Sequence, residues 1–322
     1  MMRSIQVTVT MAMALCGAAV AHAQAFPTRP VRIVIPFAPG GGTDNLTRIM
    51  APKLTDLLGQ QILIDNRPGA SGQIGTELVA RAAPDGYTLA HIDTSFTSNP
   101  SLYRKLPYDT VKDFAPVSQL ASAPVVLMIH PSVPVKSLKE LIAFAKAQPG
   151  ELNFATGGVG SATHLGLELF KGTAGLNIVH IPFKGSGPAT AAVLAGHVVM
   201  TVAGPSTTAP FVAAGKLRAL AITGDKRNSA MPQVPTFAES GVRGVDAGTD
   251  WVSVAPTGTP RESIATLNGA MVRVLQMPDI VKRLTEMGFE PIASSPEVCG
   301  THIREALARW ARVVAQANIR VE

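Results

Sequence analysis

Cysteine is nearly absent from this chain of 322 residues. It has 2 cysteines, Cys16 and Cys299. Cys16 falls in an N-terminal segment that we expect to be removed, so no internal disulfide can form and the fold must depend on its apolar core. The histidines show no metal-ligand spacing, and one cysteine does not make a metal site. We therefore expect neither a metal ion nor another cofactor.

Long apolar runs are also scarce. Residues 1–23 carry one charge, Arg3, then the short apolar stretch "MAMALCGAAVA" and the small-residue ending "AHA". This pattern predicts a signal peptide, residues 1–23, cleaved after Ala23. The stretch is too short for a membrane anchor, and Leu15 stands before Cys16 where a lipoprotein signal has a small residue. No later segment is apolar enough to span a bilayer, so we expect a soluble periplasmic protein.

Charge and aromatic residues are sparse as well. The chain has 28 Lys+Arg against 22 Asp+Glu, and 5% of its residues are aromatic. The basic residues are scattered, with few aromatics between them, so a nucleic-acid partner is not expected. A mild positive field suits small anions, and the low aromatic content indicates no stacking cage.

Apolar, β-branched runs alternate with helical patterns throughout the chain. "VRIVIPF" (31–37) predicts a strand, and apolar residues at three- and four-residue spacing after it predict a helix that ends at Gly59. A second series of strands and helices begins near residue 117. The alternation predicts an α/β fold with mainly parallel strand pairing, divided into two domains.

A glycine-rich loop joins the first strand to the first helix. Gly40, Gly41 and Gly42 precede Thr43 and Asp44, one of which we expect to be the helix N-cap. The free N–H groups of a helical first turn and the helix dipole together favour a carboxylate or phosphate. An ordinary tight connection is the alternative for this loop taken alone.

A second loop, "TGGVGSATHL" (156–165), repeats this chemistry. Gly157, Gly158 and Gly160 leave the backbone bare, Ser161 adds a hydroxyl, and His164 lies in the first helical turn. Two anion cradles, one in each half of the chain, predict a ligand held between them.

The sequence motifs of nucleotide-binding proteins and of hydrolases are incomplete in this chain. The second loop lacks the last glycine of a dinucleotide fingerprint, and no P-loop lysine follows either glycine cluster. Ser161 has no nucleophile elbow around it, and no orienting acid accompanies His164. A hydrolase using Ser161 and His164 stays open as an alternative, as does a plain capping role for Ser161.

Seven motifs in order resemble one family. They are "RPVRIVIPFAPGGGTD", "DNRPGASGQIGTELVARAAPDGYTL", "NPSLYRKLPYD", "GVGSATHL", "IPFKGSGPA", "GKLRALAITG" and "APTGTP". They are similar to the Bug-type extracytoplasmic solute receptors of tripartite tricarboxylate transporters, over nearly the whole chain after residue 23. The motifs are specific for the family but not for its ligand.

The resemblance implies a type II periplasmic binding protein, a monomer without catalysis. Two domains, each a mostly parallel sheet flanked by helices, would close on a small carboxylate, often a dicarboxylate, and offer it to a membrane permease. We expect residues 26–124 plus 250–322 to form one domain and residues 125–249 the other. A receptor that reports ligand to a membrane signalling protein is a further alternative.

The family pattern also indicates binding residues. One ligand carboxylate would lie against Phe37, Ala38, Pro39, Gly41 and Thr43 in the first loop, and against Gly160, Ser161 and His164 in the second. Asp44 would brace the first loop, since a carboxylate facing the ligand would repel it. Candidates for the distal part of the ligand are Thr94, Ser95, Asn99, Lys184, Gly185, Ser186, Ser206, Thr207 and Asp250. An acidic residue at the cleft would favour a ligand with an amino or hydroxyl group.

Overall fold

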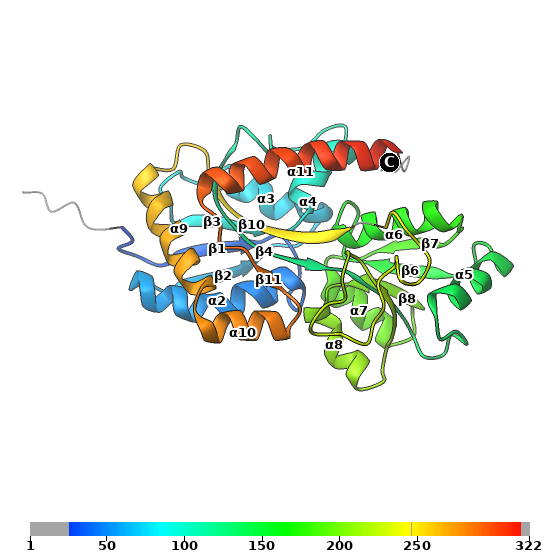
Figure 1. Ribbon diagram of the computed structural model, residues 1–322. Helices are drawn as coiled ribbons and strands as arrows, with labels where there is room; N and C mark the ends of the chain where they lie inside the picture. Colours follow the sequence, from blue (N-terminus) through cyan, green and yellow to red (C-terminus); the bar gives the residue numbers. More distant parts are fainter. Residues whose placement is uncertain (1–25, 246, 317–322) are drawn as a thin grey trace, which may run out of the picture.

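A computed structural model describes residues 26–245 and 247–316 of the chain. The expected signal peptide lies outside these residues. Two β-sheets with helices on their faces lie side by side in the described part (Figure 1). No helix among the described residues has the length and apolarity needed to cross a membrane.

The first sheet has six strands in the order β11-β4-β10-β3-β1-β2. Its strands are β1 (Val31–Ile35), β2 (Ile62–Asn66), β3 (Thr88–Ile92), β4 (Phe114–Pro124), β10 (Gly248–Pro256) and β11 (Glu290–Pro291). The second sheet has five strands in the order β7-β6-β8-β5-β9. Its strands are β5 (Val126–Ile129), β6 (Asn153–Thr156), β7 (Val179–Pro182), β8 (Met200–Ala203) and β9 (Arg218–Ile222).

The α/β class is confirmed, but the expected mainly parallel pairing is corrected to mixed sheets. The pairs β1–β2, β1–β3, β6–β7 and β6–β8 are parallel. The strands β10 and β5 instead pair antiparallel with both of their neighbours. A parallel pair needs a crossover helix, whereas β10 enters the first sheet directly from the second half of the chain and so runs against its neighbours.

The chain passes between the two sheets twice. It leaves the first sheet at the end of β4, enters the second through β5, and returns through β10, which pairs with β4 from Gly248 opposite Pro124. The last three helices pack on the first sheet and its helices: α9 contacts α2 and β4, α10 contacts α2, and α11 contacts β4 and α4. Figure 1 shows β4 and β10 running together toward the second half.

Ten α-helices and one short 3-10 helix occupy the described residues. They are α2 (Gly42–Leu58), η1 (Ala70–Gly72), α3 (Gln73–Ala80), α4 (Ser95–Leu102), α5 (Leu138–Ala147), α6 (Ala162–Ala174), α7 (Ser186–Leu194), α8 (Pro205–Ala213), α9 (Arg261–Leu275), α10 (Pro278–Glu286) and α11 (Pro296–Gln316). As the sequence predicts, α2 ends at Gly59, in the left-handed conformation at φ 64°. It begins earlier than expected, however, because its N-cap is Gly41 rather than Thr43 or Asp44.

Each sheet has its own apolar core. Ile33, Met50 and Leu89 are fully buried in the first, and Leu127 and Phe154 are fully buried in the second. A smaller cluster joins the two halves. It consists of Leu102 from α4, Leu165 from α6, and Ala306, Trp310 and Val314 from α11.

Candidate functional site

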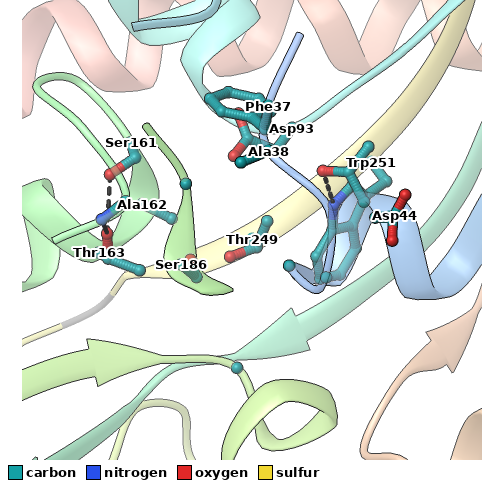
Figure 2. A pocket seen from close by; sticks show the side chains of 16 residues that line it. Phe37, Ala38, Asp44, Asp93, Ser161, Ala162, Thr163, Ser186, Thr249 and Trp251 are labelled. Carbon is teal, nitrogen blue, oxygen red and sulfur yellow. Dashed lines mark hydrogen bonds between the residues drawn. The ribbon is translucent and has the colours of Figure 1, made fainter. Parts of the chain in front are cut away.

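The first turns of α2 and α6 line one cavity between the two sheets. Its volume is about 30 Å³. The residues around it are Phe37, Ala38, Gly41, Gly42, Thr43, Asp44, Asp93, Gly157, Ser161, Ala162, Thr163, Gly185, Ser186, Gly204, Thr249 and Trp251. Figure 2 shows Ser161, Thr163 and Ser186 on one side of the cavity, Phe37, Asp93 and Trp251 on the other, and Thr249 between them.

The first loop presents backbone donors to this cavity. Gly41 is the N-cap of α2, and its carbonyl accepts the first helical hydrogen bond from the N–H of Asn45 at 2.9 Å. Within the described residues, the N–H groups of Gly42 and Thr43 have no acceptor. They lie at the positive end of the α2 dipole, so an anion in the cavity would satisfy them.

Asp44 braces this loop from its own helix. One carboxylate oxygen accepts from the N–H of Gly40 at 3.0 Å and from Nε of Arg48 at 2.9 Å. The other accepts from Nδ2 of Asn66 at 3.1 Å. Burial raises the pKa of Asp44, but the hydrogen bonds from Arg48, Gly40 and Asn66 outweigh it and hold the pKa below its ordinary value. Asp44 is therefore an ionised group whose charge is already neutralised.

Trp251 on β10 supports the start of α2. Its indole Nε1 donates to Oγ1 of Thr43 at 2.9 Å, and the ring is 3% exposed. The ring also lies directly under Gly42, where an added Cβ would come within 2.6 Å of the indole Cζ2 atom. Glycine is required at this position by the close approach of the ring rather than by backbone freedom.

The second loop is fixed by Ser161, the N-cap of α6. Its Oγ accepts from the N–H of His164 at 3.3 Å, donates to the carbonyl of Gly158 at 2.7 Å and lies 2.7 Å from Oγ1 of Thr163. The Thr163 hydroxyl in turn accepts from the N–H of Gly157 at 2.9 Å. The Ser161 hydroxyl is thus engaged in capping, and the donors that this loop offers to the cavity are backbone N–H groups of the first turn of α6.

His164 does not activate Ser161. Its ring Nδ1 accepts from the N–H of Gly160 at 3.2 Å, and the ring stacks on that of His180 with centroids 4.3 Å apart. Burial lowers the pKa of His164 to about 4 and that of His180 also to about 4. The imidazole is a buried neutral group behind the loop, and the pair that a hydrolase would need is not formed.

The two halves contact each other around the cavity. The N–H of Ala38 donates to the carbonyl of Lys184 at 2.9 Å, and Nδ2 of Asn45 donates to the carbonyl of Ser206 at 3.2 Å. Oγ of Ser98 donates to the carbonyl of Gly160 at 2.5 Å. Because these hydrogen bonds join loops of the two halves directly, the structure is in a closed conformation around the cavity.

The structure brings only part of the sequence-predicted set to the cavity. Phe37, Ala38, Gly41, Thr43, Asp44, Ser161, Gly185 and Ser186 line it. Ten others do not: Pro39, Thr94, Ser95, Asn99, Gly160, His164, Lys184, Ser206, Thr207 and Asp250. The Thr94 hydroxyl joins α4 to β10, because it donates to the carbonyl of Gly248 at 3.2 Å and accepts from the N–H of Asp250 at 3.0 Å.

Lys184 borders a second cavity, of about 200 Å³. Phe37 and Gly157 line both cavities, so the two adjoin across these residues. The other residues around the second cavity are Gly69, Ala70, Ser71, Gly72, Gly158, Val159, Pro182 and Phe183.

Asp250 points away from the cavity, contrary to the role considered for it. Its Oδ2 lies 3.3 Å from a guanidinium nitrogen of Arg309 and 3.7 Å from Nε2 of His302, both on α11. Side chains alternate along a strand, so Thr249 and Trp251 face the cavity and Asp250 faces the opposite side. That alternation was visible in "GTDWVSV" and was the signal that could have identified Thr249 and Trp251.

Asp93 is the acidic residue that the structure places at the cavity instead. It follows β3, whose Ala90 pairs in parallel with Val34 of β1, so both strands end at the same edge. Oδ1 accepts from the N–H of Ser95 at 2.9 Å. Burial raises the pKa of Asp93 above its ordinary value.

Comparison with known proteins identifies the family. The model of the tripartite tricarboxylate transporter family receptor matches residues 46–319. The chain belongs to this family. This membership confirms the resemblance seen in the motifs, and it identifies a solute-binding receptor of the periplasm rather than an enzyme.

Several solved structures are similar to this chain over most of their length. The periplasmic binding protein BugD is 31% identical, with a TM-score of 0.89 over 92% of this chain and 100% of its own. An R. palustris protein solved with adipate is 37% identical, with a TM-score of 0.89 over 92% of this chain and 99% of its own. MatC from Rhodopseudomonas palustris, with bound malate, is 35% identical, with a TM-score of 0.86 over 90% of this chain and 100% of its own.

Proposed function

We propose that this receptor captures a small carboxylate in the cavity between its two halves. The observation that carries the proposal is the convergence of the α2 and α6 first turns on one cavity from opposite halves. Each turn supplies N–H groups at the positive end of a helix dipole, where a carboxylate forms charge-assisted hydrogen bonds. Gly41, Gly42 and Gly157 leave these groups open to the ligand.

Capture would proceed by closure of two domains. Residues 26–124 plus 250–322 form one domain in this proposal, and residues 125–249 form the other. The hinges lie at the two passages between the sheets, where β4 passes into β5 and where the chain returns at Gly248. A ligand that touches both loops binds the closed form more tightly than the open one, and this difference in affinity drives closure.

The ligand class follows from the site and its relatives. Adipate and malate, present in two of the similar structures, are both dicarboxylates. One carboxylate would occupy the cavity between the helix N-termini, and the rest of the ligand would extend past Phe37 toward the second cavity and Lys184. The signal peptide would direct the protein to the periplasm, where the monomeric receptor would deliver its ligand to a tripartite tricarboxylate-type permease.

A binding screen tests this proposal. The protein without residues 1–23 is titrated by calorimetry with aliphatic mono-, di- and tricarboxylates and with aromatic carboxylates, and each amide serves as the matched uncharged control. We expect at least one carboxylate to bind at micromolar or lower Kd and its amide to bind at least about tenfold more weakly, the loss of one charge-assisted hydrogen bond. Binding of amides as tightly as acids, or of no carboxylate, would refute carboxylate capture.

A further inference from the structure

Two acidic side chains border the cavity between the helix N-termini, and only one of them is neutralised. Asp44 pairs with Arg48 at 2.9 Å. Asp93 forms no ion pair with any lysine, arginine or histidine of the described residues. The nearby His91 is fully buried, and its pKa is lowered to about 3 by burial, so it supplies no positive charge. A cavity built to attract an anion thus holds one carboxyl group without a cation.

The hydroxyl group of Thr249 is a second polar group at the cavity. Thr249 is 7% exposed and lines the cavity from β10, next to the passage between the halves. Its hydroxyl forms no hydrogen bond within residues 26–245 and 247–316. Figure 2 shows Thr249 between the second loop and the side of the cavity that carries Asp93. This oxygen is open to the cavity rather than sealed inside the protein, so a ligand group can form a hydrogen bond with it.

We infer that Asp93 and Thr249 bind the ammonium group of an amino acid, whose carboxylate lies at the helix N-termini. An ammonium group has three N–H donors, a carboxylate and a hydroxyl oxygen accept them, and its charge neutralises Asp93. A plain carboxylate would instead place a second negative charge near Asp93 in a site shielded from water. The inference rests on the proposed function, because it assigns the ligand class of the same cavity.

A protonated Asp93 is the competing arrangement. Burial raises the pKa of this carboxyl, and a neutral carboxyl group would donate a hydrogen bond to a hydroxyl or carboxylate oxygen of the ligand. That arrangement would favour hydroxy acids such as malate. The ammonium ligand is favoured here because the helix N–H groups already supply donors for a carboxylate, whereas Asp93 and Thr249 together supply acceptors.

Matched ligands separate these outcomes. Calorimetry at pH 7.5 compares succinate, L-malate and L-aspartate, then adipate with L-2-aminoadipate, and 3-phenylpropionate with L-phenylalanine. In any of these three sets that binds, we expect the ligand with the amino group to bind at least about tenfold more tightly than the plain acid of the same carbon skeleton. A plain or hydroxy acid that equals or exceeds its amino counterpart overturns the inference and leaves carboxylate capture intact. Binding of no member of any set overturns both.

Variants then assign the preference to its residues. Asp93→Asn should reduce the affinity for the amino member at least about tenfold and strengthen binding of the plain acid, because it removes a negative charge from the cavity. Thr249→Val should weaken the amino member several-fold. Asp279→Asn removes the same charge from an exposed position on α10 and should change neither affinity. Thermal unfolding checks that each variant is folded. If a folded Asp93→Asn protein still prefers the amino acid over the plain acid, the role given to Asp93 is wrong. If the variant does not fold, the comparison of ligands on the wild-type protein still decides the ligand class.

Discussion

The indole Nε1 of Trp251 donates a hydrogen bond to Oγ1 of Thr43 at 2.9 Å, and this bond connects strand β10 to the first turn of α2. One residue comes from the passage between the halves and the other from the proposed anion site. Both are buried. The position of the first loop is therefore set by a strand that enters the sheet more than 200 residues later in the chain.

A double-mutant cycle measures this connection. Trp251→Phe, Thr43→Val and the double variant are compared by urea unfolding, and we expect a coupling free energy of about 1 kcal/mol, typical of a neutral buried hydrogen bond. Both single variants should also bind the carboxylate ligand more weakly, because the first turn loses its support. Additive effects on unfolding would show that the bond contributes nothing to stability.

Gly42→Ala should damage the site severely. The new Cβ would lie 2.6 Å from the indole ring, so either the ring or the first turn of α2 must shift, at a cost of about 1 to 3 kcal/mol. Ligand affinity should fall at least about tenfold, measured by calorimetry. Gly172→Ala on α6, where no atom lies within 4 Å of the new Cβ, is the matched control. Equal affinity in the two variants would contradict the role given to the α2 first turn.

Ser161→Ala tests the second loop. The hydroxyl caps α6 rather than pointing free into the cavity, so the variant should lose about 1 kcal/mol of unfolding free energy. Binding should weaken as well, because the loop that aligns the α6 N–H groups loses its anchor. Ser137→Ala removes the equivalent cap of α5, away from the cavity, and should lower stability without changing affinity. If both variants bind the ligand like wild type, the α6 turn is not part of the site.

Three histidines with lowered pKa values, of which His91 and His164 are buried and His180 is half-buried, predict acid sensitivity. Burial lowers the pKa of His91 to about 3 and the pKa values of His164 and His180 to about 4, against an ordinary value of 6.5. Between about pH 6.5 and 4 the unfolded chain binds more protons than the folded protein. The contribution of these histidines to the free energy of unfolding should therefore be complete above pH 6.5. It should decrease as the pH drops toward 4, by up to about 1.4 kcal/mol per pH unit for each histidine.

Urea unfolding at pH 7.5, 6 and 5 checks this slope. Asp93, whose pKa is raised, contributes with the opposite sign, because its folded form binds a proton more readily than the unfolded one. His91→Gln should reduce the slope, and His197→Gln, at an exposed position, is the control. A free energy of unfolding that does not change between pH 6.5 and 5 would contradict the neutral state of the buried rings.

The sequence was most informative where a local rule applies. Three consecutive glycines before a helical pattern predicted the first loop, and the Ser161 cap was visible three residues before His164. Mixed strand pairing was missed because local patterns carry no strand direction. Asp93 was missed because its role depends on neighbours from β1 and β10, which are distant in sequence. Asp250 was considered because it lies near the passage between the halves. The alternation in β10 was visible in the sequence, but which of its two faces meets the cavity depends on the neighbouring elements.

The small apolar cluster around Trp310 has a consequence for the unliganded receptor. Leu165 of α6 packs there against side chains of α4 and α11, so any separation of the halves that moves α6 exposes it. Exposing a leucine costs about 1.5 to 3 kcal/mol. The unliganded receptor should therefore populate the closed form to a large extent. A permease that takes the ligand must then provide the free energy that separates the two halves. The distance between spin labels on α5 and α9 would report the fraction of unliganded receptor in the closed form, and Leu165→Ala should lower that fraction.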